Sequence, residues 1–169
     1  MIKTINGKTP KIAASAFVSQ TAVIVGDVDI GENCGIFMGT VIRGDFNGIK
    51  IGKNTDIEDN CVLHVRTPME IGENCVLGHA VVIQARRVGR NTLIGMHATV
   101  LDEAEIGNNC VIAAGAVVLG GAKIPDDSFV VGVPGVVKGK VSAKQSGLVA
   151  EHFGDYTPEF KRKCKEAGL

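Results

Sequence analysis

Aliphatic residues recur at every sixth position over most of the chain. The series has twenty-one members and changes register three times. A six-residue unit holds a short strand and a tight corner, and three units close a coil of about eighteen residues. The pattern therefore predicts a parallel β-solenoid of roughly seven coils over residues 1–140. The members are Ile12, Val18, Ile24, Ile30, Ile36, Ile42, Ile51, Ile57, Leu63, Ile71, Leu77, Ile83, Val88, Ile94, Val100, Ile106, Ile112, Val118, Ile124, Val130 and Val136.

Small residues dominate the fourth position after each aliphatic residue, and four of the five cysteines occupy this position. We interpret these four as inward side chains that fill a narrow core. Five cysteines without paired spacing indicate neither a disulfide framework nor a cysteine-rich zinc ribbon. Gly often follows the aliphatic residue directly, and Asn pairs after it supply turn chemistry. The four cysteines are Cys34, Cys61, Cys75 and Cys110.

The repeat ends after Lys140, and residues 141–169 read as a helical segment. Ser142 and Gln145 have the spacing of a capping box, which predicts a helix start. Gly154 ends this helix, and Thr157-Pro158 begins a second short one. We expect the segment to pack on the solenoid or on a neighbouring subunit. The apolar side of the first helix carries Leu148, Val149, His152 and Phe153, and we assign His152 to the helix surface or its packing.

The charge balance excludes several kinds of partner. Lys plus Arg and Asp plus Glu number 18 each, so no basic surface is expected for nucleic acid or for an anionic membrane. Met1 to Pro10 has no apolar core of signal-peptide length, and no apolar run approaches membrane-spanning length. We therefore expect a soluble cytoplasmic protein that binds a small molecule or another protein.

Counting three units per coil places polar residues in columns. Arg43, His64 and Gln84 each follow an aliphatic residue three units apart, so they should stack on one face in successive coils. Side chains stacked about 4.8 Å apart can converge on one ion, which gives His64 and Gln84 chelating geometry. His79 falls on a different face, one coil from Glu58 and Asp59. A neighbouring subunit could bring it across.

Four motifs together resemble the γ-class carbonic anhydrases, which are hexapeptide-repeat proteins. They are Arg43-Gly44-Asp45, Ile57-Glu58-Asp59-Asn60 followed by His64, Gly78-His79, and Ile94-Gly95-Met96. The resemblance covers about residues 12 to 139. It implies an all-β fold, a left-handed parallel β-helix with a C-terminal α-helical tail, because the six-residue period alone does not decide the hand. It also implies a homotrimer with a metal, Zn or else Fe or Co, between subunits.

The resemblance assigns roles residue by residue. Three histidines bind the metal in that family, two from one chain and one from the next, and the matching positions are His64, His79 and Gln84. Gln84 thus replaces the third histidine. The candidate catalytic residues are Glu58, where the family usually has Gln, Asp59 in the inner polar network, and Arg43 with Asp45, which would form an ion pair between subunits.

Two further departures concern ligands and proton transfer. The acidic proton-shuttle loop of the best-studied family members is absent, since Val65-Arg66-Thr67-Pro68 follows His64 and Phe46 follows the Arg-Gly-Asp motif. One hypothesis is that His97 turns toward His79 and restores a third nitrogen ligand. The alternative makes His97 a polar interface residue.

Three functions stay open at this point. The first is a γ-carbonic anhydrase-like lyase with weak reversible CO₂ hydration or activity on another small carbonyl compound. The second is a coenzyme-A-dependent acyltransferase, because many solenoids with this repeat transfer acyl groups. Those enzymes typically project a loop with a catalytic histidine, and no insertion here exceeds three residues. The third is a non-catalytic trimeric scaffold.

Overall fold

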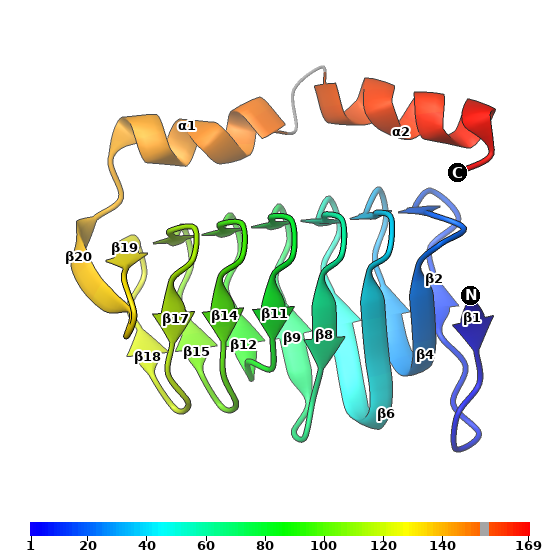
Figure 1. Cartoon of the computed structure of the whole chain (residues 1–169), viewed down its shortest axis with the longest axis horizontal. Helices are drawn as coiled ribbons and strands as arrows, with labels where there is room; N and C mark the ends of the chain where they lie inside the picture. The colour runs from blue at the N-terminus through cyan, green and yellow to red at the C-terminus, as the bar shows by residue number, and fades with distance from the viewer. Residues whose placement is uncertain (153–155) are drawn as a thin grey trace.

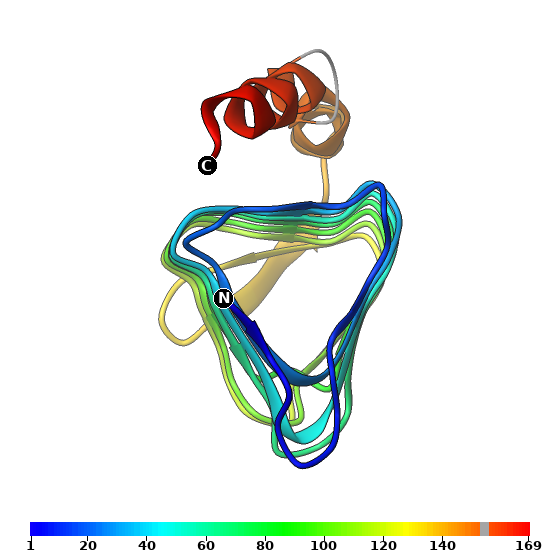
Figure 2. The ribbon, with the colours of Figure 1, turned by 90° about the vertical axis from the view of Figure 1, so that its right-hand side faces the viewer.

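The structure is a computed structural model that describes residues 1–152 and 156–169. The described chain winds into a triangular coil, with two helices outside it (Figures 1 and 2). The strands are β1 (Ile2–Lys3), β2 (Lys11–Ile12), β3 (Phe17–Val18), β4 (Val23–Ile30), β5 (Gly35–Ile36), β6 (Val41–Ile51), β7 (Asp56–Ile57), β8 (Val62–His64), β9 (Met69–Ile71), β10 (Val76–Leu77), β11 (Val82–Ile83), β12 (Arg87–Val88), β13 (Leu93–Ile94), β14 (Thr99–Val100), β15 (Glu105–Ile106), β16 (Val111–Ile112), β17 (Val117–Val118), β18 (Lys123–Ile124), β19 (Ser128–Val131) and β20 (Val136–Lys140). The helices are α1 (Ala143–His152) and α2 (Tyr156–Ala167).

Three faces of parallel strands make up the solenoid, which confirms the predicted left-handed parallel β-helix with a helical tail. The first face contains β8, β11, β14 and β17, and the second contains β9, β12, β15 and β18. β6 belongs to both, since it pairs with β8 and then, further along, with β9. The third face runs from β3 through β5, β7, β10, β13 and β16 to β19 and β20.

The inward aliphatic residues form one continuous core. Every member of the predicted series from Ile24 to Val130 is buried, whereas Ile12 and Val18 near the N-terminus are half-buried. The prediction for Val136 was wrong, because this residue is 54% exposed. The chain turns at Gly132, which has φ +94°, and returns as β20 antiparallel to β19. The six-residue spacing therefore continues past the last true coil.

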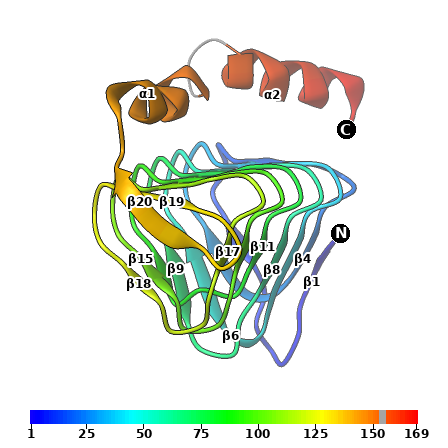
Figure 3. The same cartoon turned by 60° about the vertical axis from the view of Figure 1, so that its left-hand side comes forward.

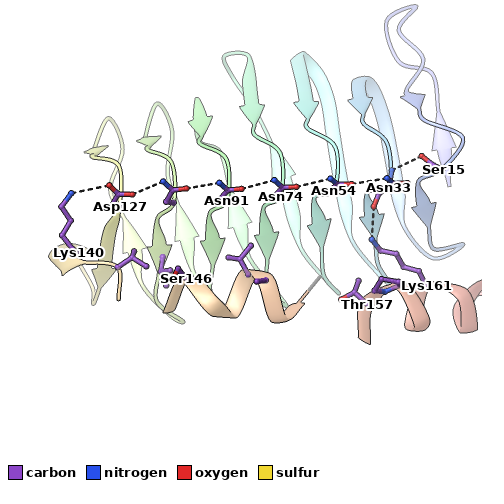
Figure 4. Close-up of a pocket in the computed structure, with 16 residues that line it drawn as sticks. Ser15, Asn33, Asn54, Asn74, Asn91, Asp127, Lys140, Ser146, Thr157 and Lys161 are labelled. Atoms are coloured by element: carbon purple, nitrogen blue, oxygen red, sulfur yellow. Dashed lines mark hydrogen bonds and ion pairs between the residues drawn. The ribbon is translucent and has the colours of Figure 1, made fainter. Parts of the chain in front are cut away.

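One corner of the solenoid carries a column of asparagines in left-handed backbone conformation, which Asn tolerates better than most residues. Each side-chain amide donates to the next side chain at 3.0–3.2 Å (Figure 4). We call this column the asparagine ladder; a cleft of about 1050 Å³ separates it from the helices. Its members are Asn33, Asn54, Asn74, Asn91, Asn109 and Asp127.

Both helices run along the third face (Figures 1 and 3). The capping box is confirmed: Gln145 Oε1 accepts from the Ser142 amide at 2.8 Å, and Ser142 Oγ accepts from the Gln145 amide at 3.3 Å. Phe153 and Gly154 lie outside the described residues. α2 packs on the coil through Phe160, whose ring centroid is 5.7 Å from that of Phe37. Neither described helix has the length and apolar character needed to cross a bilayer.

Candidate functional site

The Arg-Gly-Asp motif lies in β6, where this strand passes from the first face toward the second. A side chain at Gly44 would place its Cβ 2.4 Å from the backbone oxygen of Asp27, so the close approach of β4 and β6 requires glycine. Arg43 and Asp45, two residues apart on the same strand, point to the same side. Arg43 Nη2 donates to Asp45 Oδ2 at 3.0 Å. The two side chains thus form an ion pair within one chain, and the ion pair between subunits stays a prediction.

His64 ends β8 and stacks directly on Arg43 in the register of the first face. Its Nε2 lies 3.1 Å from Asp45 Oδ1 and 3.3 Å from Arg43 Nη2. Partial desolvation opposes ionisation of Asp45, but hydrogen bonds from its own backbone amide and from Arg43 lower the pKa of its carboxyl below the usual range. Asp45 therefore stays ionised and fixes the orientation of the imidazole.

Gln84 follows β11 in the next coil and completes the predicted column. Its side-chain Nε2 lies 3.4 Å from His64 Nδ1. The oxygen and nitrogen of an amide group are interchangeable assignments, so either can face the histidine. Ligands of a tetrahedral zinc ion at 2.0–2.1 Å lie about 3.3 Å from one another. The spacing of His64 and Gln84 is therefore compatible with two donors on one ion.

His79 occupies a corner of the third face, beside two carboxylates one coil away. Its Nδ1 lies 3.2 Å from Asp59 Oδ2, and its Nε2 lies 3.4 Å from Glu58 Oε2. Glu58 Oε2 also accepts from the backbone amide of His79 at 3.1 Å. The His79 side chain is nonetheless 47% exposed. A histidine that is oriented by two carboxylates and open to solvent is available to a second chain.

His97 lies in the coil beyond His79 but one position further along, and its backbone amide donates to the His79 carbonyl oxygen at 2.9 Å. The backbones of His97 and His79 are therefore close together, as predicted. The His97 ring is exposed, and among residues 1–152 and 156–169 it makes no side-chain contact with His79. The left-handed conformation of His97, with φ +58°, places it in the column of Ala80, one position past His79. Its role as a replacement ligand stays a prediction.

Two contacts near these residues were missed by sequence reasoning. Phe46 is 73% exposed and places its ring centroid 5.8 Å from that of His64 in an edge-on arrangement. His152 at the end of α1 lies 3.2 Å from Asp56 Oδ2 and 3.7 Å from Glu58 Oε1. The sequence does carry one indication of a buried partner at this place. Asp56 is a single carboxylate in an outward column of the third face that otherwise holds apolar residues or glycine.

The donor atoms determine whether a metal could bind here. Within the described part of one chain, no group of three or more His, Cys, Asp or Glu residues could hold a metal ion. His64 and Gln84 offer two donors on the first face, while no contact in this part of the chain joins them to His79. The residues therefore fit a metal only as two donors from one copy and one from another.

Comparison with known proteins places the chain in a class and then in a family. Residues 87–120 match the family model described as "Bacterial transferase hexapeptide (six repeats)". The chain is 46% identical over 143 residues to a Methanocaldococcus jannaschii protein named "Probable carbonic anhydrase", covering 83% of this chain and 90% of that protein. It is 45% identical over 98 residues to a carbonic anhydrase of Geobacillus kaustophilus, of which it spans about half, 54%.

Solved structures give the same class. A hexapeptide transferase family protein from Anaplasma phagocytophilum superposes with a TM-score of 0.89 and 26% identity, covering 98% of this chain and 97% of that one. A perosamine N-acetyltransferase from Caulobacter crescentus, in complex with CoA and GDP-perosamine, superposes with a TM-score of 0.57 and 27% identity, covering 78% of this chain and 57% of that one. The fold and site thus define a hexapeptide-repeat β-helix protein. Within this class, the chain belongs to the γ-class carbonic anhydrase-like family.

Proposed function

We propose that the protein is a homotrimer in which His79 of one copy meets His64 and Gln84 of another. The observation that carries this proposal is an outward aliphatic column on the first face, directly beside the His64–Gln84 column. Val62 and Val82 stack in it and are 38% and 42% exposed. Leu101 and Leu119 continue the column of His64 and Gln84 in the next two coils, and their side chains are 36% and 51% exposed. An apolar strip of this kind favours a protein contact.

The proposed trimer supports a metal centre for reversible CO₂ hydration or a related reaction of a small carbonyl compound. His64, Gln84 and the neighbour's copy of His79 would hold Zn, Fe or Co. When bound, zinc lowers the pKa of a water ligand toward neutrality and so supplies a hydroxide nucleophile. An amide in place of an imidazole weakens a site for zinc, so the proposed activity is weak.

The protein's own groups have definite tasks in this proposal. Asp45, held ionised by Arg43, fixes the tautomer and orientation of His64 through Nε2, as a carboxylate does for a ligating histidine. Asp59 would orient His79 through Nδ1, and Glu58 would have to release Nε2 for that nitrogen to bind the ion. The exposed ring of Phe46 borders His64 and would exclude water from that side. The cytoplasmic location expected from the sequence is part of this proposal.

The decisive experiment is metal analysis of protein purified without chelators or a metal-binding tag, together with CO₂ hydration assays. We expect about one metal ion per chain, and Gln84→His should raise the metal affinity about tenfold or more. Gln20→His, at an exposed site away from the column, is the matched control and should leave the affinity unchanged. Less than about 0.2 Zn, Fe or Co per chain after these ions are added back would refute the metal centre.

A second candidate is coenzyme-A-dependent acyl transfer, favoured by one observation. Asp59 contacts Nδ1 of His79, and such a carboxylate–histidine pair can act as a general base without a metal. The similarity to the perosamine N-acetyltransferase fits this reading. Acetyl-coenzyme-A turnover by metal-free protein would support it. A protein without metal and without either activity would be the non-catalytic scaffold.

A further inference from the structure

Asp56 is a fully buried carboxylate on the outside of the solenoid. It belongs to β7, and its outward position stacks between Gly35 and Val76 on the third face. Val76 and Val111 of the same face are 2% and 5% exposed, and the C-terminal helices run along this face (Figure 1). The Asp56 side chain is 0% exposed. A charge removed from water in this way is stable only with close partners.

Lys161 of α2 supplies the first partner. Its Nζ lies 2.5 Å from Asp56 Oδ1 and also donates to the Asn33 carbonyl oxygen at 3.1 Å. The side chain reaches the carboxylate over Gly35. A Cβ at Gly35 would lie 2.6 Å from both Asp56 Oδ1 and Lys161 Cε, so the absence of a side chain there provides the space for the pair.

His152 supplies the second partner and extends the contact to the candidate site. Its Nε2 faces Asp56 Oδ2 at 3.2 Å, and because that carboxylate is paired with Lys161, the histidine nitrogen donates. Its Nδ1 lies 3.7 Å from Glu58 Oε1, which is too long for a hydrogen bond, so this contact is an ion pair only when both ring nitrogens carry a proton. The other oxygen of Glu58 contacts both the ring and the backbone amide of His79. Glu58 therefore lies between the end of α1 and the corner that carries His79.

We propose that His152 and Lys161 form a C-terminal anchor that positions Glu58 and, through it, the imidazole of His79. The C-terminal segment is then a working part of the site, because it determines how His79 is presented to the neighbouring copy. His152 and Lys161 are positioning residues, since they would act on His79 through Asp56 and Glu58. This inference extends the proposed function, in which His79 is a ligand donated across the trimer.

The test reads the His79 imidazole directly by NMR of full-length, metal-free protein with ¹³C,¹⁵N-labelled histidine. The chain has four histidines, so His79→Gln assigns the resonance by its loss. We expect His152→Ala to move the His79 ring cross-peak by more than its linewidth. His152→Gln keeps a donor toward Asp56 and should return the peak most of the way. Lys163→Met, at an exposed lysine of α2, should leave the peak in place.

A second variant separates positioning from simple docking of the helices. Asp56→Val with Lys161→Met replaces the buried pair by apolar side chains, and valine already occupies the stacked position at Val76. Trypsin cleavage after Arg162, Lys163 and Lys165 reports whether α2 stays docked. We expect α2 to remain resistant while the His79 peak moves. An unmoved His79 peak in this double variant or in His152→Ala would overturn the proposal.

The readout keeps this inference separate from the proposed function. The His79 resonance needs neither metal nor substrate, so a protein that fails to bind metal would refute the metal centre while a shifted peak still supports the anchor. Conversely, full metal binding with an unmoved His79 peak would refute the anchor alone.

Discussion

Individual inward side chains of the third face do more than fill volume. Hydroxyl and thiol groups alternate there, and those from Cys34 to Cys110 each donate to a backbone carbonyl of the following coil. Cys75 Sγ donates to the Gly89 oxygen at 3.1 Å, and Thr55 Oγ1 donates to the Gly72 oxygen at 2.9 Å. Thr55 Oγ1 in turn accepts from the Cys75 amide at 3.1 Å. The predicted core-filling thiols are buried, and their hydrogen bonds also satisfy polar groups that have no access to water.

Thiol chemistry gives the prediction at this scale. Desolvation by burial raises the pKa of Cys61 and of Cys75 to about 12 each. The folded state therefore retains these protons when the unfolded state has lost them, so stability is complete below about pH 8.5 and falls as pH rises toward 12, by roughly 1.4 kcal/mol per pH unit for each thiol.

Melting temperatures measured from pH 8 to 11 check this slope. Cys75→Thr copies Thr55 and Thr92 of adjacent coils, so it should fold and show a shallower decline. Iodoacetamide at pH 8 should leave Cys61 and Cys75 unmodified in the folded protein and label them in denaturant. Alkylation of the folded protein at the rate of a free thiol would contradict the assignment.

At the scale of strands, the second face carries a column of alternating charge. Its outward residues pair in register across successive strands, and each has the opposite sign to its neighbours. A slip of one strand would change these pairings and expose core residues. The alternation therefore favours the observed register. The column comprises Lys11, Asp29, Lys50, Glu70, Arg87, Glu105 and Lys123.

Reversing one charge in this column tests its contribution. Glu70→Lys places a third cation between Lys50 and Arg87, and we expect the free energy of unfolding to fall by about 1 kcal/mol. Glu70→Gln should lower the free energy of unfolding by less, because it removes the attraction to Lys50 and Arg87 without adding a repulsive charge. Urea unfolding in 0.05 M and 1 M NaCl measures both, and the difference between the variants should shrink at high salt. Equal stability of the two variants at low salt would show that the column is inert.

Much of the strand arrangement follows from the sequence alone, since a period of six sends one aliphatic side chain inward per unit. The column of Arg43, His64 and Gln84 could be predicted for the same reason, by counting units per coil. The end of the solenoid could not, because the spacing to Val136 is the same whether the chain advances or reverses. The outward place of Asp56 in an apolar column indicates that it needs a buried partner, but the sequence does not identify His152 as that partner, because the two are 96 positions apart and meet through the packing of a helix.

The whole molecule presents three faces with different surfaces. The helices cover the third, alternating charges line the second, and the first leaves its aliphatic column exposed beside His64. In the proposed trimer, the first face is the surface through which the copies associate. The six-residue period shows which side chains point inward, but it contains no information on the hand of the coil or on the number of copies. Both of these predictions therefore came from the family resemblance.

Disruption of the first face should dissociate the proposed trimer. Val82→Asp places a carboxylate in the aliphatic column, and we expect monomers by light scattering after size-exclusion chromatography, together with loss of bound metal. Val137→Asp makes the same change at a valine that is 49% exposed on β20, and it should leave the trimer intact. A trimeric Val82→Asp protein would show that this face is not the contact.

The asparagine ladder has one further consequence. Each asparagine donates toward the C-terminal end, and the last rung is Asp127, a carboxylate that accepts from Asn109 and pairs with Lys140 at 3.6 Å. A stack of identical rungs carries no information about its own length. The Asp127 carboxylate ends the series of amide donors, and strand β20 pairs antiparallel with β19 over the final coil. The end of the ladder therefore offers no free amide donor to which a second molecule could add another rung.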